Sequence, residues 1–95
     1  MAELKGWGAV ILERRNGRIA GGPVGGRPLF EILYYGPGEK GTTIVNQGWR
    51  LYEARWHKTR FGKPVVNKHA RRALVGVFGS EADALDAARK RWHNG

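Results

Sequence analysis

The sequence predicts an α+β fold in which an antiparallel β-sheet of about five to six strands packs against one C-terminal α-helix. Short segments with strand-like patterns, separated by Gly, Pro and Asn-Gly turns, occupy most of residues 7–78. Residues 80–92 instead carry apolar side chains at helical spacing. We expect residues 1–95 to form one small domain, with β-hairpins and glycine-rich loops over residues 1–48 and a basic sheet plus helix over residues 49–92.

The N-terminal half contains two strong strand signals. The apolar segment 7–13 is followed by an Asn-Gly pair at residues 16–17, which accepts the positive φ angles of a type I′ turn. The returning strand, residues 18–20, should be short, because the glycine-rich segment 21–26 is typical of a loop. Residues 28–35 (PLFEILYY) have a period of two with both faces largely apolar, which predicts the central strand.

The basic half begins with a long predicted strand. In residues 49–59, Tyr52 and Trp56 fall on the same face of an extended chain, and we expect both aromatics to pack inward. A turn at residues 60–63 follows, in which Gly62 supplies a positive φ. The further strands are predicted at residues 42–47, 64–67 and 73–78.

The C-terminal helix has clear start and stop signals. Ser80 is a typical N-cap residue, with Asp83 three positions later as in a capping box. Acids lie in the first turns and basic residues in the last turn, which complements the helix dipole. The stripe that should contact the sheet comprises Ala84, Leu85, Ala88 and Trp92.

The charge is concentrated in one part of the chain. The protein carries a formal net charge of +9, and residues 50–72 hold eight Lys or Arg against one acid. Such a balance indicates a polyanionic partner, most simply DNA, bound through phosphates. The predicted hairpin contacts are Arg50, Arg55, Lys58, Arg60 and Lys63, and the predicted backbone contacts in the following loop are Lys68, Arg71 and Arg72.

Several alternatives stay open at this level. Trp56 and Phe61 could stack on unpaired bases instead of packing in a core, so duplex and single-stranded DNA are both candidates, and RNA is allowed by composition. The basic surface could instead bind an acidic host protein, as in a small phage-encoded host-takeover protein that inhibits a nucleic-acid enzyme. The hairpin at residues 7–20 either forms a dimer edge or belongs to the core.

The strand-to-helix junction resembles a known pattern. Residues 74–80 (LVGVFGS), followed by acids and alanines at residues 81–88, are similar to the same junction in AP2 domains and in the arm-type DNA-binding domains of phage integrases. The resemblance implies a three-stranded sheet that packs on the helix and lays its exposed face in the DNA major groove. The basic strands 50–59 and 63–67 would belong to that sheet, whereas residues 68–72 and the first 48 residues have no counterpart.

Catalysis, metal binding and membrane insertion have little support. The chain has no Cys, and its His residues have no carboxylate at a ligand-like spacing, so we expect neither an enzyme, a metal site nor a cofactor. The apolar segment at residues 9–12 is too short for a signal peptide or a membrane span. We therefore expect a soluble, cytoplasmic protein.

Overall fold

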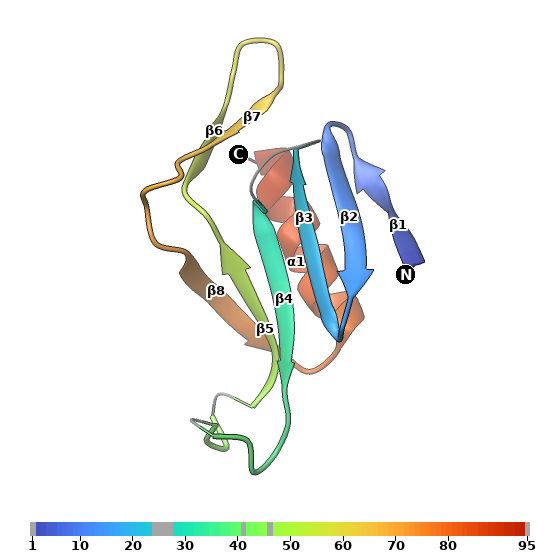
Figure 1. Ribbon diagram of the computed structural model, residues 1–95, viewed down its shortest axis with the longest axis vertical. Coiled ribbons are helices and arrows are strands. Elements are labelled where there is room, and N and C mark those ends of the chain that lie inside the picture. The colour runs from blue at the N-terminus through green and yellow to red at the C-terminus, as the bar shows by residue number, and fades with distance from the viewer. Residues whose placement is uncertain (1, 24–27, 41, 46, 95) are drawn as a thin grey trace.

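The computed structural model describes residues 2–23, 28–40, 42–45 and 47–94, and it confirms the α+β fold. A six-stranded antiparallel sheet has the order β1-β2-β3-β4-β5-β8, and β6 pairs with β7 in a separate hairpin (Figure 1). The strands are β1 (Ala2–Trp7), β2 (Val10–Arg15), β3 (Arg18–Pro23), β4 (Phe30–Tyr35), β5 (Gly48–Glu53), β6 (Trp56–Lys58), β7 (Pro64–Val66) and β8 (Ala73–Phe78), and the helix is α1 (Glu81–Asn94).

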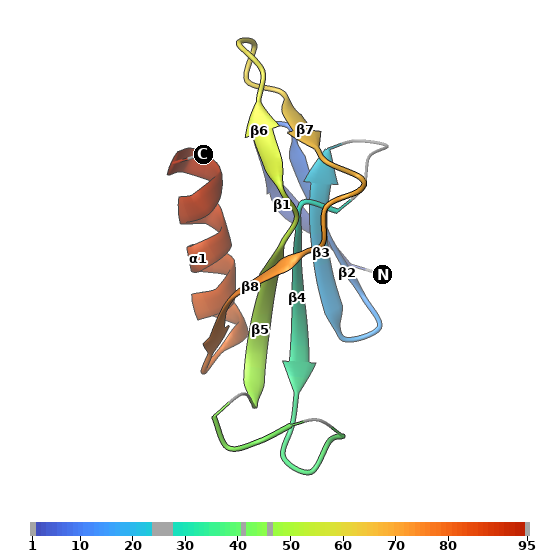
Figure 2. The ribbon, with the colours of Figure 1, turned by 90° about the vertical axis from the view of Figure 1, so that its left-hand side faces the viewer.

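The molecule has two layers. Figure 2 shows α1 lying against one face of the six-stranded sheet, while the opposite face, here called the open face, carries no helix. The β6–β7 hairpin extends beyond one end of the sheet, beside the C-terminal end of α1, and the loop between β4 and β5 extends beyond the other end (Figure 1). The fold therefore leaves two free surfaces near basic residues, the open face and the hairpin.

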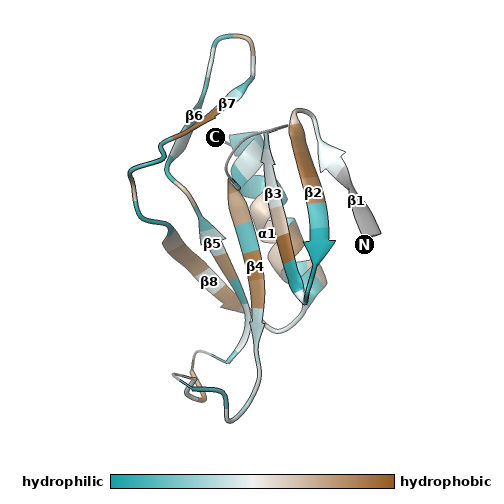
Figure 3. Cartoon of the chain, in the orientation of Figure 1, coloured by the Kyte–Doolittle hydropathy of each residue, from teal (hydrophilic) through white to brown (hydrophobic). Residues whose placement is uncertain are grey.

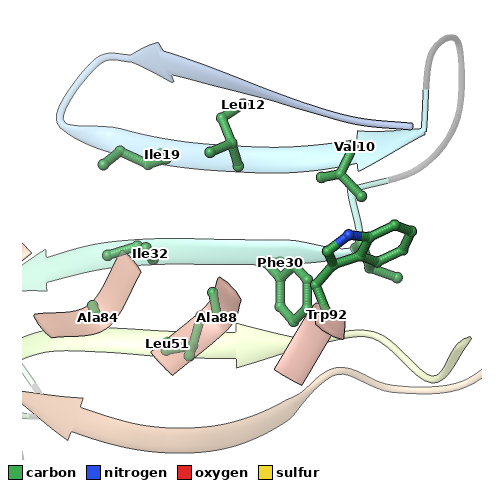
Figure 4. Packing of buried hydrophobic residues seen from close by; sticks show 10 residues of the cluster. Val10, Leu12, Ile19, Phe30, Ile32, Leu51, Ala84, Ala88 and Trp92 are labelled. Atoms are coloured by element: carbon green, nitrogen blue, oxygen red, sulfur yellow. The ribbon is translucent and has the colours of Figure 1, made fainter. Parts of the chain in front are cut away.

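The core fills the space between the sheet and α1. Strand alternation directs Phe30, Ile32 and Leu51 toward the helix, and all are at most 2% exposed. From α1, Ala84 and Ala88 meet these side chains, and Figure 4 shows their methyl groups lying against the strands. Small alanines bring the helix close to the sheet, and Trp92 closes the end of the core nearest the hairpin.

The predicted turn and the predicted helix start, which depend on residues close together in the sequence, are both confirmed. Asn16 and Gly17 have φ angles of 51° and 73°, as a type I′ turn requires. The Ser80 hydroxyl accepts a hydrogen bond from the Asp83 N–H at 3.1 Å and caps α1. Glu81 in the first turn receives two hydrogen bonds from the Arg14 guanidinium, which hold the pKa of this carboxyl below its usual range. This ion pair ties the start of α1 to β2.

The central-strand prediction is confirmed, but two other strand boundaries were wrong. β4 lies between β3 and β5. β3 does not stop at residue 20 but continues through Pro23. Within this extension Gly21 pairs with Leu12, and a Cβ on the glycine would lie 2.4 Å from the Leu12 side chain. The remainder of the predicted loop, residues 24–26, is outside the described residues.

Residues 42–47 were predicted to form a strand, and this was wrong for the residues that are described there. β4 pairs directly with β5, from Tyr35 opposite Gly48 onward, so no neighbouring strand reaches this segment. Ile44 and Val45 are 88% and 89% exposed. Their β-branched side chains favour extended backbone, but a strand also needs a partner for its hydrogen bonds.

The predicted long strand 49–59 is also broken, which changes the face on which Tyr52 lies. The Ala54 N–H donates to the Leu29 carbonyl at 2.9 Å and so leaves the β5–β8 ladder, and β6 starts only at residue 56. Leu51 is fully buried toward α1, and Tyr52 opposes Glu31 on the open face. The expectation that Tyr52 and Trp56 share an inward face was therefore wrong for Tyr52; Trp56 does pack against the core.

Replacing Leu51 with Ala should lower the free energy of unfolding by about 2–5 kcal/mol, because it removes a fully buried side chain and leaves a cavity. The matched control is Leu74→Ala on the neighbouring strand β8, where the side chain is 50% exposed and the loss should be below about 1 kcal/mol. Urea unfolding followed by tryptophan fluorescence measures both. Equal losses would contradict the assignment of the two faces.

Candidate nucleic-acid interface

The structure separates the eight predicted contact residues into distinct places. β5 carries one of them on the open face, and the segment between β7 and β8, here called the linker (residues 67–72), sends a second one there. Three lie on the β6–β7 hairpin, and the others lie at its base or in the linker. The two residues of the open face are Arg50 from β5 and Arg72 from the linker. The hairpin carries Lys58, Arg60 and Lys63, and the residues at its base or in the linker are Arg55, Lys68 and Arg71.

Arg50 and two tyrosines form the centre of the open face. The Arg50 guanidinium lies 3.8 Å from the centroid of the Tyr35 ring, a distance typical of a cation–π contact. It also donates to the Tyr52 hydroxyl at 3.4 Å. The strand register places Leu33 directly opposite Arg50, between the two aromatic positions. These contacts hold the guanidinium against the open face of the sheet.

A buried carboxylate organises the neighbouring part of the open face. Glu31 on β4 is only 8% exposed, and its carboxylate binds Arg18 of β3 at 3.5 Å. The same carboxylate forms an ion pair with Arg72, whose guanidinium also lies 5.5 Å from the Tyr52 ring. Glu31 thus attaches the end of the linker to the sheet and fixes where β8 begins.

The hairpin ends in a tight turn that displays its basic residues. The Thr59 hydroxyl accepts hydrogen bonds from the N–H groups of Phe61 and Lys63 at 3.3 and 3.2 Å, and Gly62 has a φ of +80°. Phe61 is 79% exposed, and the Arg60 guanidinium lies 4.9 Å from its ring. A large apolar side chain and two cations are therefore held at the far end of the hairpin.

The base of the hairpin is fixed by stacked aromatic rings. Trp56 of β6 stacks on Trp92 of α1 with ring centroids 5.4 Å apart. The Lys58 ammonium lies 4.2 Å from the Trp92 ring, and the Trp56 indole N–H donates to Glu53 at 2.7 Å. This stack orients a hairpin that makes no ladder with the six-stranded sheet.

Apart from Ala70, the linker is hydrophilic, whereas β8 is largely apolar (Figure 3). The Asn67 side chain accepts a hydrogen bond from the His69 N–H at 2.9 Å, which makes a local turn. Arg71 and Arg55 line a cavity of about 570 Å³ between the sheet edge and the end of α1.

The charge at the hairpin end is not balanced by nearby acids. In the described part of the chain, the carboxylates that form ion pairs bind cations of β2, β3, α1 and the end of the linker. Among the described residues, the cations left without such an acidic partner include Lys40 in the loop between β4 and β5 and a group of five: Arg55, Lys58, Arg60, Lys63 and Arg71. All five of this group lie on the hairpin, at its base or in the linker.

Sequence reasoning missed four basic residues near these surfaces. Arg15 and Arg18 pair across the β2–β3 hairpin, and Arg18 lies opposite Leu33 on the open face. Strand alternation counted from the Asn-Gly turn could have placed both arginines on that face. Lys90 and Arg91 line the cavity with Arg55, and the sequence explained them only as partners of the helix dipole.

No group of three or more His, Asp or Glu that could hold a metal ion occurs among the described residues. Within the same residues, no helix combines the length and apolar character needed to cross a membrane. No family model, curated protein or solved structure was found to match the chain.

Glu31→Gln should lower the free energy of unfolding by about 1–2 kcal/mol, because two charge-assisted hydrogen bonds at partly exposed arginines become neutral ones. Glu13→Gln is the matched control: its pair with Arg15 is 3.8 Å long and exposed, and its loss should cost less than about 0.5 kcal/mol. Chemical denaturation measures both variants. If the Glu31→Gln protein is as stable as the control, the carboxylate does not organise the open face.

Proposed function

We propose that this protein binds duplex DNA, with the β6–β7 hairpin in the major groove and the basic linker on the phosphate backbone. The observation that carries the proposal is the group of five cations at one end of the molecule with no acidic partner among the described residues. Surface cations that serve only solubility are usually interspersed with acids, whereas a one-sided cluster attracts phosphates.

The widths of the two candidate surfaces favour the hairpin as the element in the groove. Six strands at a spacing of ~4.8 Å make a sheet ~24 Å across, which exceeds the ~12 Å width of the major groove. A two-stranded ribbon fits that groove. The arginines of the open face are moreover engaged with Tyr35, Tyr52 and Glu31. We therefore assign groove contact to the hairpin.

The residues divide by the contacts that they would make. Arg60 and Lys63 at the turn enter the groove, where each would neutralise a bordering phosphate and Arg60 could also pair with guanine. Phe61 between them offers an apolar surface of the kind that contacts a thymine methyl group. On the flanks, Arg55, Lys68 and Arg71 would bind phosphates and set the position of the hairpin on the duplex.

Removing the two cations of the turn should weaken binding and reduce its salt dependence. For Arg60→Gln/Lys63→Gln, the slope of log affinity against log salt should become less steep by ~1.8, because each phosphate contact contributes ~0.9 for duplex DNA. Fluorescence anisotropy with a labelled duplex across a salt series measures this slope.

The control double variant is Arg15→Gln/Lys40→Gln, which removes the same charge. Arg15 ends β2, and Lys40 belongs to the loop between β4 and β5, so both lie at the end of the molecule away from the hairpin (Figure 1). This variant should keep the slope of the unaltered protein. If both variants change the slope equally, binding depends on net charge alone and the assignment to the hairpin is wrong.

Phe61→Ala tests the apolar contact separately from the electrostatic one. Because no charge is removed, affinity should fall while the salt slope stays unchanged. Loss of one stacked base would cost ~1–3 kcal/mol on a single strand, so the same titration on an unpaired strand shows which substrate the ring prefers. A larger loss on single-stranded DNA or RNA than on the duplex would reassign the substrate.

The rival partner is an acidic host protein, which would use the same five cations. Capture from a lysate with and without nuclease treatment separates the two partners. Loss of captured material after nuclease, together with duplex binding by the purified protein, supports the proposal. The absence of binding to duplex, single-stranded DNA and RNA at low salt would overturn it.

A further inference from the structure

The cavity beside the C-terminal end of α1 gathers positive side chains from three segments of the chain. Arg55 comes from the link between β5 and β6, and Arg71 comes from the linker before β8. Lys90 and Arg91 come from the last turns of α1. These segments are far apart in sequence, and the break after β5 brings them together around one space of about 570 Å³.

The one acid in the wall, Glu53, offsets only the charge of Arg91. Both carboxylate oxygens of Glu53 are occupied, one by the Arg91 guanidinium at 2.7 Å and the other by the Trp56 indole N–H at 2.7 Å. Lys90 binds Asp86, four residues earlier on the same helix, at 3.1 Å. Arg55 and Arg71 line the cavity without an acidic partner in the described part of the chain.

We propose that this cavity binds a phosphate monoester, carried either by a free nucleotide or by the 5′ end of a nucleic-acid strand. A monoester carries a charge of about −1.5 to −2 at pH 7 and three strong acceptor oxygens. The planar forks of Arg55 and Arg71 suit such oxygens because each guanidinium can form two parallel hydrogen bonds. An internal phosphodiester has one negative charge and fewer free oxygens, so it gains less from the same residues.

The size and lining of the cavity fit a nucleotide. Its volume of about 570 Å³ lies within the usual range of small-molecule pockets, roughly 300–1,000 Å³. Trp56, with Ala54 and Ala73, gives the cavity an apolar wall beside the cations. The site shares Arg55 and Arg71 with the backbone contacts proposed above, but a free nucleotide would bind here whether or not the hairpin enters DNA.

Calorimetric titration of the full chain with 5′-AMP, adenosine and inorganic phosphate tests the site. AMP should bind at least about tenfold more tightly than adenosine, because only AMP engages the two guanidinium forks, and inorganic phosphate should compete with it. Arg55→Gln/Arg71→Gln should weaken AMP binding by about tenfold or more. Arg15→Gln/Lys40→Gln, which removes equal charge far from the cavity, should leave AMP binding unchanged.

Duplexes of one sequence with and without 5′ phosphates identify the source of the monoester. A preference for the phosphorylated duplex that disappears in Arg55→Gln/Arg71→Gln assigns the cavity to strand ends, and AMP binding without that preference assigns it to free nucleotides. Equal binding of AMP and adenosine, with no effect of the 5′ phosphate, overturns the proposal. Arg60→Gln/Lys63→Gln should retain AMP binding, so failure of duplex binding and failure of this site give different results.

Discussion

The stack of Trp56 on Trp92 is the contact on which the arrangement of the basic end depends. It joins β6 to the last turn of α1, while Glu53 links both elements to the end of β5 through Trp56 and Arg91. Phe30 packs its ring edge-on to Trp56 and continues the aromatic contact into the core. Hairpin, helix and sheet thus meet at one aromatic junction, and without it the hairpin would have no fixed direction.

The elements that could be predicted from the sequence are those with local determinants. The cap at Ser80, the charge gradient along α1 and the Asn-Gly turn each act within a few residues, and each was confirmed. The break after β5 could not be predicted, because its cause is a hydrogen bond to Leu29, distant in sequence. The burial of Leu51 and the exposure of Tyr52 follow from the same tertiary pairing.

The sequence indicated which residues belong to the basic region, but not where each of them lies in the fold. Charge density alone indicated residues 50–72 as the basic region. The distribution of these residues among the open face, the hairpin and the cavity depends on the partners of Glu31 and Glu53, which cross-link segments from different parts of the chain. Arg18 and Arg91 entered the basic surfaces only through those tertiary contacts.

The separation of the β6–β7 hairpin from the six-stranded sheet has a consequence for how this protein can vary. The turn from Thr59 to Lys63 is closed by its own hydrogen bonds, and its tip residues are exposed. Substitutions there do not alter the interior, so the side chains that the tip displays can be changed without refolding the scaffold. The Trp56–Trp92 junction, in contrast, packs against the core and tolerates little change, so the molecule combines a fixed support with a replaceable tip.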